Sequence, residues 1–191
     1  MASAPTANQI KTQLIALLTP VIGTSGTKKA KILDYLPLAY LVRETEDATV
    51  LKSSLDTATL AGGSTTQRIN CLMITELAFS QEPPQRDGSR YVTEAGGRNN
   101  ISRRFGFAYV YQFGAGSEAT FSTNVEAIRM TLNSNPKLGF ATVTSTLAGP
   151  GQYVRDHDGL QVQTMLPDHF SGIICHLMEG VLTVRIMEPL G

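Results

Sequence analysis

The chain has 191 residues, and its 16 lysines and arginines are balanced by 16 aspartates and glutamates. This length suits a single domain, 1–191, with one well-buried core. Because the charges balance, the chain has no overall positive field, and the composition argues against specific binding to nucleic acid or to an anionic membrane surface.

The N-terminal part predicts one helix and one strand. Apolar residues recur at spacings of three and four over 10–21, which is typical of an amphipathic helix, and Pro20 and Gly23 are expected to end it. Residues 36–42 are apolar and rich in strand formers, so we predict a strand there, with Pro37 near its start marking a sheet edge. Residues 43–63 are rich in Ser, Thr and Gly and predict a loop or a short helix.

Two strong strands are predicted in the middle of the chain. The first is the apolar run 68–79, which is bounded by turn-forming residues. The second, 104–113, has an aromatic ring at every second position, with Gly, Ala, Val and Gln between the rings. Successive side chains of a strand point to opposite faces, so all the rings share one face. We therefore expect 104–113 to be the central strand. Its rings are Phe105, Phe107, Tyr109, Tyr111 and Phe113.

The stretch between these strands, 81–103, predicts a hairpin arm or long loop that projects from the sheet. It contains two adjacent prolines, three turn-forming pairs and few apolar residues, and such long segments are usually functional or disordered. Its arginines are candidates for contacts with a partner, although a charged loop is often only solvated. They are Arg86, Arg90, Arg98 and Arg103.

The C-terminal part predicts a helix and several strands. Thr123 and Glu126 have the spacing of a capping box, which predicts a helix over 124–133. We then expect strands at 140–147 and 160–165, and a final hairpin of 170–178 and 181–187 that turns at Glu179 and Gly180. The element order predicts an α+β fold, with a mostly antiparallel or mixed sheet and two main helices on one face.

None of the motifs predicts catalysis, a metal site or a cofactor. Asp156, His157 and Asp158 are types that bind cations, but adjacent residues do not easily face one ion, and Asp158-Gly159 is a common turn. Cys175 and His176 are adjacent in a predicted strand, so one is expected in the core and the other at the surface; Asp168 and His169 are likewise adjacent. The glycine-rich stretches 61–64 and 114–117 lack the lysine of a phosphate loop and are interpreted as linkers.

The aromatic stripe, the cysteines and the N-terminal apolar run bear on binding, redox state and membrane insertion. The ring stripe of 104–113 has the periodicity of a base-stacking platform, but no basic residues stand between the rings, so a core strand is favoured. Cys71 and Cys175 lie in apolar runs and are expected to be buried free thiols of an intracellular protein. The apolar run within 1–20 is too short to cross about 30 Å of hydrocarbon, so no membrane segment is expected.

The order of elements resembles that of the tail terminator proteins of long-tailed bacteriophages. The resemblance covers most of the chain. It rests on the N-terminal helix 10–21, the Leu36-Pro37 strand, two long strands with a projecting loop, the helix after the aromatic strand, and the polar segment 153–159 before the last strand.

This resemblance implies a virion structural protein without enzymatic activity or cofactor. It implies a homo-oligomeric ring, of six copies in that family, which caps the tail tube, stops its growth and meets the head or neck connector. The implied partners are the tail tube protein and the connector, with the tail sheath as a further candidate, and the implied location is the virion after assembly in the host cytoplasm. The alternatives are another neck, connector, tail-tube or baseplate protein, or a small hydrolase or ligand-binding α+β protein.

Overall fold

The sheet is organised around β4 (Arg98–Gln112), which pairs antiparallel with β3 (Gln67–Glu82) on one side and β7 (Ile173–Pro189) on the other. The computed structural model describes residues 5–23, 30–44, 48–54, 67–82, 98–140 and 154–189. The remaining strands pair with the two neighbours of β4. They are β1 (Lys31–Leu33), parallel to β3; β2 (Lys52–Ser54), antiparallel to β3; and β5 (Val154–His157) and β6 (Gln161–Phe170), both antiparallel to β7.

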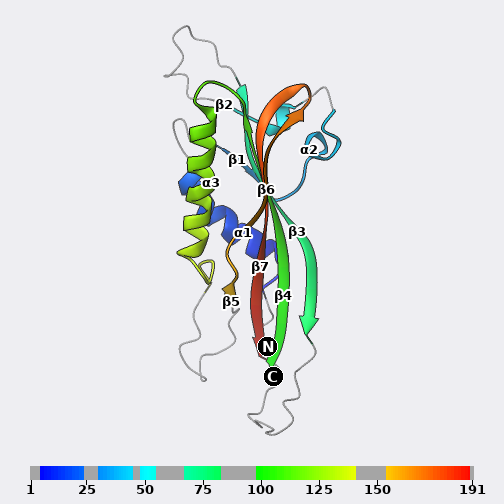
Figure 1. Cartoon of the computed structure of the whole chain (residues 1–191). Coiled ribbons are helices and arrows are strands. Elements are labelled where there is room, and N and C mark those ends of the chain that lie inside the picture. The colour runs from blue at the N-terminus through cyan, green and yellow to red at the C-terminus, as the bar shows by residue number, and fades with distance from the viewer. Residues whose placement is uncertain are drawn as a thin grey trace.

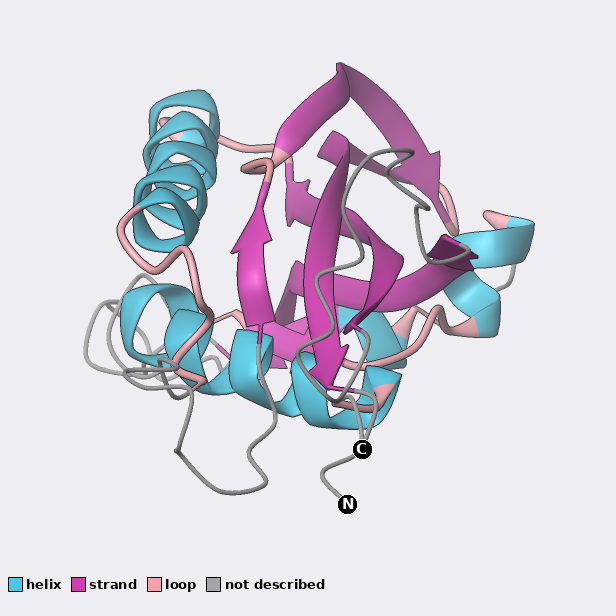
Figure 2. Ribbon diagram, turned by 90° about the horizontal axis from the view of Figure 1, so that it is seen from below, coloured by secondary structure: helices cyan, strands magenta, loops and turns pink. Residues whose placement is uncertain are grey.

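Helices cover both sides of this mixed, curled sheet. In Figure 1, α1 (Ala7–Leu18) and α3 (Ser117–Asn133) lie on one side of the strands, and the short α2 (Leu38–Val42) lies on the other. Figure 2 shows the curl of the sheet between them. The architecture is α+β with two main helices on one face, which confirms the predicted class.

The predicted helix 10–21 is confirmed as α1, which continues as a π-helical turn over Thr19–Gly23. Its start is fixed by a capping box, because the Thr6 hydroxyl accepts from the Gln9 amide while the Gln9 side chain accepts from the Thr6 amide. Ile10, Leu14 and Leu18 form its buried stripe.

The aromatic strand is confirmed as the centre of the fold. Phe105, Phe107 and Tyr109 are buried on the face covered by α1 and α3, and Ala108 and Val110 are buried on the face covered by α2. Both faces of β4 therefore lie in core. The stripe ends earlier than predicted, since Phe113 lies beyond β4 and is 52% exposed.

The predicted strand 36–42 is wrong, because residues 38–42 form α2. Pro37 is its N-cap with extended backbone, and Arg43 ends it in the left-handed region at φ 61°. A short apolar run does not reveal its period. In the helix, the Tyr40 ring stacks on that of Phe170, with 5.8 Å between the ring centroids. The segment before it contains β1, and residues 49–54 form a 3-10 turn and β2 where a loop or short helix was predicted.

The predicted start of the second main helix is also wrong. α3 begins at Ser117, directly after Gly116 reverses the chain at φ 71°. Thr123 lies inside the helix, where its hydroxyl donates to the Ala119 carbonyl at 2.8 Å, and Glu126 pairs with Arg129. The first turns of α3 are mostly polar in sequence, so they show no apolar pattern, although Phe121 within them packs into the core.

The predicted C-terminal hairpin is wrong, because β7 is one continuous strand and Glu179 and Gly180 lie opposite Ala108 and Phe107. Contacts with other parts of the chain explain why both residues lie in a strand. The Glu179 carboxylate binds Tyr40 and Arg43, and a Cβ on Gly180 would lie 3.0 Å from the Gln161 carbonyl oxygen. The true turn is Ser171-Gly172, where both residues have positive φ.

β6 confirms the predicted strand 160–165 but extends to Phe170, and β5 occupies part of the segment predicted as a polar turn. The predicted strand 140–147 lies, after Phe140, outside the described residues. Where it is described, the predicted arm 81–103 does not project from the sheet. Gln81 and Glu82 belong to β3, opposite Ile101 and Asn100, and residues 98–103 of β4 also pair with β7. Residues 83–97 lie outside the described residues.

Candidate functional site

The four arginines predicted as interaction residues have different positions. Arg86 and Arg90 lie outside the described residues, and Arg98 is the first residue of β4. Arg103 is engaged within its own sheet, because its Nη1 donates to Glu76 Oε1 at 2.6 Å and its guanidinium lies 4.7 Å from the Phe79 ring centroid. Its contacts are therefore those of a residue that holds β3 to β4.

Each side chain of the segment Asp156-His157-Asp158 has a different partner. Asp156 pairs with Arg185 at 3.0 Å, Asp158 accepts from the Thr183 amide, and His157 Nε2 lies 3.1 Å from the Leu132 carbonyl oxygen. No group of His, Cys, Asp and Glu within the described ranges is arranged to hold a metal ion. The three residues join β5 to β7 and to the end of α3.

Cys71 and Cys175 are buried free thiols in the core under α2, as predicted. Burial raises the pKa of each thiol to about 12, so neither is a thiolate at neutral pH. The prediction that one of Cys175 and His176 lies at the surface is wrong. His176 points to the opposite face, as expected, but it is only 8% exposed because Phe113 and Phe121 cover it.

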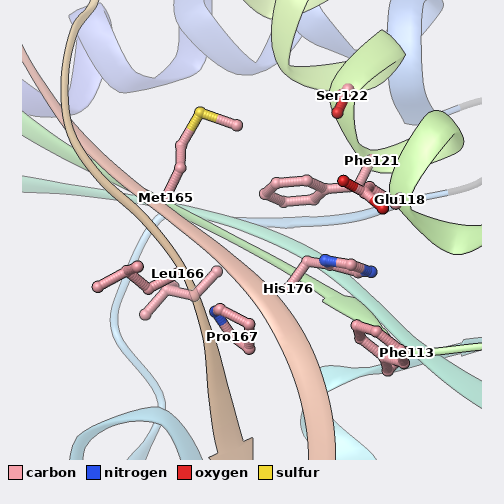
Figure 3. Close-up of a pocket in the computed structure, with 9 residues that line it drawn as sticks. Phe113, Glu118, Phe121, Ser122, Met165, Leu166, Pro167 and His176 are labelled. Atoms are coloured by element: carbon pink, nitrogen blue, oxygen red, sulfur yellow. The ribbon is translucent and has the colours of Figure 1, made fainter.

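His176 forms one wall of a cavity between α3 and the β6–β7 hairpin, which we call the His176 cavity (Figure 3). Its volume is about 330 Å³. The imidazole stacks on Phe113 at 4.5 Å and on Phe121 at 5.1 Å between ring centroids. The lining residues come from three places: Phe113 after β4; Glu118, Phe121 and Ser122 on α3; and Met165, Leu166, Pro167, His176 and Leu177 on the hairpin.

The electrostatics of this cavity favour a positive charge. Burial lowers the pKa of His176 from its ordinary value of 6.5, although the nearby Glu118 carboxylate opposes that shift. The imidazole is therefore neutral at pH 7. Glu118 is exposed and stands beside the rings, and the described lining contains no lysine or arginine. The cavity thus combines aromatic faces, aliphatic surface and one carboxylate.

Ser117 and His176 make a contact that sequence reasoning missed. Ser117 Oγ lies 2.9 Å from His176 Nε2 and also accepts from the Gly114 amide at 3.0 Å. The two residues are 59 positions apart, and the pairing of β4 with β7 brings them together. The only sequence signal was the glycine-rich stretch 114–117 between a strand and a helix, which we interpreted as a linker.

A serine bonded to a neutral histidine is also the arrangement of a nucleophile and its base. Here, however, Ser117 is buried and is absent from the described lining of the cavity, and Phe113 and Phe121 lie against the imidazole. A substrate in the cavity would meet the histidine and not the hydroxyl. The geometry therefore suits a contact that holds the start of α3 on β7.

A polar cluster on the other face holds α2 in place. Arg43 binds Asp168 and Glu179, and its guanidinium lies 4.9 Å from the Tyr40 ring centroid and 5.0 Å from that of Phe170. The Tyr40 hydroxyl donates to Glu179. The pKa of Tyr40 is raised, mainly by burial and to a smaller extent by the Glu179 carboxylate. The cluster joins α2 to the β6–β7 hairpin.

Exposed apolar residues gather at two places next to the clusters described above. The first, the α2 patch, consists of Leu38, Leu41 and Val42, which lie at helical spacing on one face of α2; Leu38 is 66% exposed. The second is the rim of the His176 cavity, where Phe113, Met165 and Leu166 are exposed.

The chain matches no known protein family, and no curated protein matches it in sequence. Among the described helices, none combines the length and the apolar character needed to span a bilayer.

Proposed function

We propose that this chain is a virion structural protein that caps the tail tube of a long-tailed bacteriophage as a homo-oligomeric ring and offers a docking face to the neck connector. In this role it binds copies of itself and the tail tube protein. It performs no catalysis.

One observation carries the ring: the α2 patch and the rim of the His176 cavity are two different exposed apolar surfaces of the same subunit. Exposed apolar patches often mark protein–protein contacts. A ring requires two different patches on each subunit that meet head to tail, and these two patches consist of different residues, as that requirement demands.

The α+β element order adds support by its resemblance to tail terminators, with one difference. Residues 38–42, which take part in that resemblance as a strand, form α2. The long β3–β4 hairpin and the helix directly after the aromatic strand remain in agreement with it.

The mass in solution tests the proposal. Light scattering of the purified chain, with and without isolated tail tubes, is expected to give a closed ring, six copies by the resemblance, or a monomer that becomes a ring on the tube. Electron microscopy of tubes assembled with the chain is expected to show a ring at one end. A chain that stays monomeric with tubes and leaves their length unchanged would exclude the proposal.

The alternative from another class is a small hydrolase, and the Ser117–His176 contact is the observation that favours it. Reaction with a fluorophosphonate probe separates the two. Labelling that disappears in Ser117→Ala would favour the hydrolase, whereas the structural role predicts no labelling of Ser117.

A further inference from the structure

We propose that the free edge of β3, residues 74–82, binds an extended acidic segment of a partner protein, which adds a strand to the sheet. This edge shares no residue with the α2 patch or with the rim of the His176 cavity. The proposal therefore goes beyond the proposed ring and does not depend on it.

The second half of β3 is paired on one side only. From Asn70 onwards β3 pairs with β4, whereas on its other side β1 pairs only with 71–73 and β2 only with 67–69. No described strand pairs with the outer side of 74–82, and this half of β3 runs along the margin of the sheet (Figure 1). Outward N–H and C=O groups of such an edge are the groups to which an added strand binds.

Apolar side chains accompany the free edge on both faces of the sheet. Leu77 is 53% exposed and Phe79 is 51% exposed. Leu77 belongs to a bulge and lies against Gly106, where a Cβ would be 3.1 Å from it. Phe79 is opposite Arg103, on the other face. An added strand would cover both apolar side chains, which favours apolar residues in the partner.

Arg104 determines the charge that the partner needs. Ala78, Arg104 and Thr183 lie opposite one another on β3, β4 and β7, so their side chains form one row. Arg104 is exposed and has no acidic partner in the part of the chain that the structure describes. Because Ala78 is short, an acid next in this row, on the added strand, can reach the guanidinium.

The other long edge of the described sheet is less suited to an added strand. β6 pairs only with β7 among the described strands, but Pro167 within it has no N–H to donate. Residues 74–82 contain no proline. This difference favours β3 as the edge that takes the partner strand, and it makes β6 an internal control.

The test uses immobilised nine-residue peptides, Val-Thr-Val-Thr-X-Thr-Val-Thr-Val, in which X is Glu, Gln or Lys. In an extended peptide X and the valines share one face, where they can meet Arg104 and Leu77. We expect the full chain to bind the Glu peptide about tenfold more tightly than the Lys peptide, with the Gln peptide between them. N-methylation of X and of the residue after it removes a donor on each edge of the peptide and should abolish binding.

Variants of the full chain locate the site. Arg104→Glu is expected to reverse the preference, so that the Lys peptide binds more tightly than the Glu peptide, a gain that misfolding cannot produce. Leu77→Ser should weaken binding of the Glu peptide about tenfold. The matched controls are Arg129→Glu, at an exposed arginine of α3, and Ile174→Ser, at an exposed apolar residue of β7. Both should bind the peptides as the unchanged chain does.

Hydrogen exchange shows where the peptide binds. The Glu peptide should slow exchange of the amides in 74–82 and leave exchange in β6 unchanged. Slower exchange in β6 instead would overturn the proposal. Equal binding of the N-methylated peptide, or equal binding of the Glu and Lys peptides, would overturn it as well.

A second copy of the chain is the competing occupant of the free edge. Self-association that Leu77→Ser abolishes and Leu38→Ser does not would assign the edge to contact between copies and overturn the acidic partner. A ring that Leu38→Ser abolishes, in a chain that still binds the Glu peptide, supports both proposals. Binding of the Glu peptide by a chain that never oligomerises supports the edge and counts against the ring.

Discussion

Asn124 on α3 donates a 2.7 Å hydrogen bond from its side-chain amide to the hydroxyl of Tyr109 on β4. That hydroxyl in turn donates to Asn70 Oδ1 on β3 at 3.0 Å. All three residues are buried, so this chain of hydrogen bonds joins the helix to two strands inside the core. Tyr109 therefore has both an apolar and a polar role.

The two roles predict different costs. Tyr109→Ala is expected to lower the free energy of unfolding by about 3–5 kcal/mol, the range for large aromatic deletions in a core. Tyr109→Phe keeps the ring but removes the acceptor of Asn124, and is expected to cost about 1–3 kcal/mol. Urea denaturation measures both. A cost below about 1 kcal/mol for the alanine variant would contradict a core position.

The free energy of unfolding is expected to decrease as the pH is lowered, because of His176. Burial lowers the pKa of the folded residue below 6.5, so the unfolded chain takes up this proton first as the pH falls. The free energy of unfolding should decrease below about pH 6.5 and continue to do so until the folded His176 is itself protonated. His176→Gln should flatten this dependence in denaturation curves between pH 5 and 8. The matched control is His169→Gln, at an exposed histidine, which should leave the pH dependence unchanged. If only this variant removed the pH dependence, His176 would not be its cause.

The thiols of Cys71 and Cys175 are expected to be unreactive in the folded chain. Their pKa values of about 12 and their burial keep them protonated and covered. A thiol reagent at pH 8 should label neither residue in the native protein and both in denaturant. Fast labelling of either thiol without denaturant would show that the core under α2 opens.

Gly180 is expected to resist substitution although it lies within a strand. A Cβ there would meet the Gln161 carbonyl oxygen and Leu160 Cδ1, both at 3.0 Å, and a backbone atom cannot move aside easily. Gly180→Ala should cost about 1–3 kcal/mol in unfolding free energy. Gly114→Ala is the control, since its nearest atom is the end of Arg68 at 3.5 Å, and it should change stability by less than about 1 kcal/mol. Equal effects would refute the steric explanation.

Replacing 83–97 by a short Gly-containing turn is expected to leave the thermal midpoint of the monomer nearly unchanged. The segment has few apolar residues to bury, so it offsets little of its ordering entropy. Ring formation should weaken at the same time, as measured by light scattering. Unfolding of the shortened chain would mean that the segment belongs to the core.

The sequence predicted the elements whose apolar or aromatic pattern repeats several times, and it failed where the pattern is short or interrupted. The helical stripe of α1 and the ring alternation of β4 extend over several repeats, so their periods are readable. α2 has five residues, too few to distinguish a helix from a strand. Its helical form depends on Arg43 and Tyr40, whose partners Asp168 and Glu179 lie far along the chain.

The Glu179-Gly180 pair shows why turn signals failed at β7. Glycine is common in turns, yet here Glu179 is held by Tyr40, and Gly180 leaves room for the Gln161 carbonyl oxygen. The His176 cavity was equally hidden, because Phe113, Glu118, Met165 and His176 converge only after β6 and β4 have paired with β7. The local sequence pattern does not show which strands will pair.

The position of β7 in the chain determines when the protein can fold during its synthesis. This strand pairs with β4, β5 and β6 and supplies buried residues to both cores. Translation proceeds from the N-terminus, so the rings of β4 leave the ribosome long before Ile173–Pro189 arrives to cover that edge. The sheet therefore cannot be completed until β7 has been made, and until then the aromatic strand has one unpaired edge.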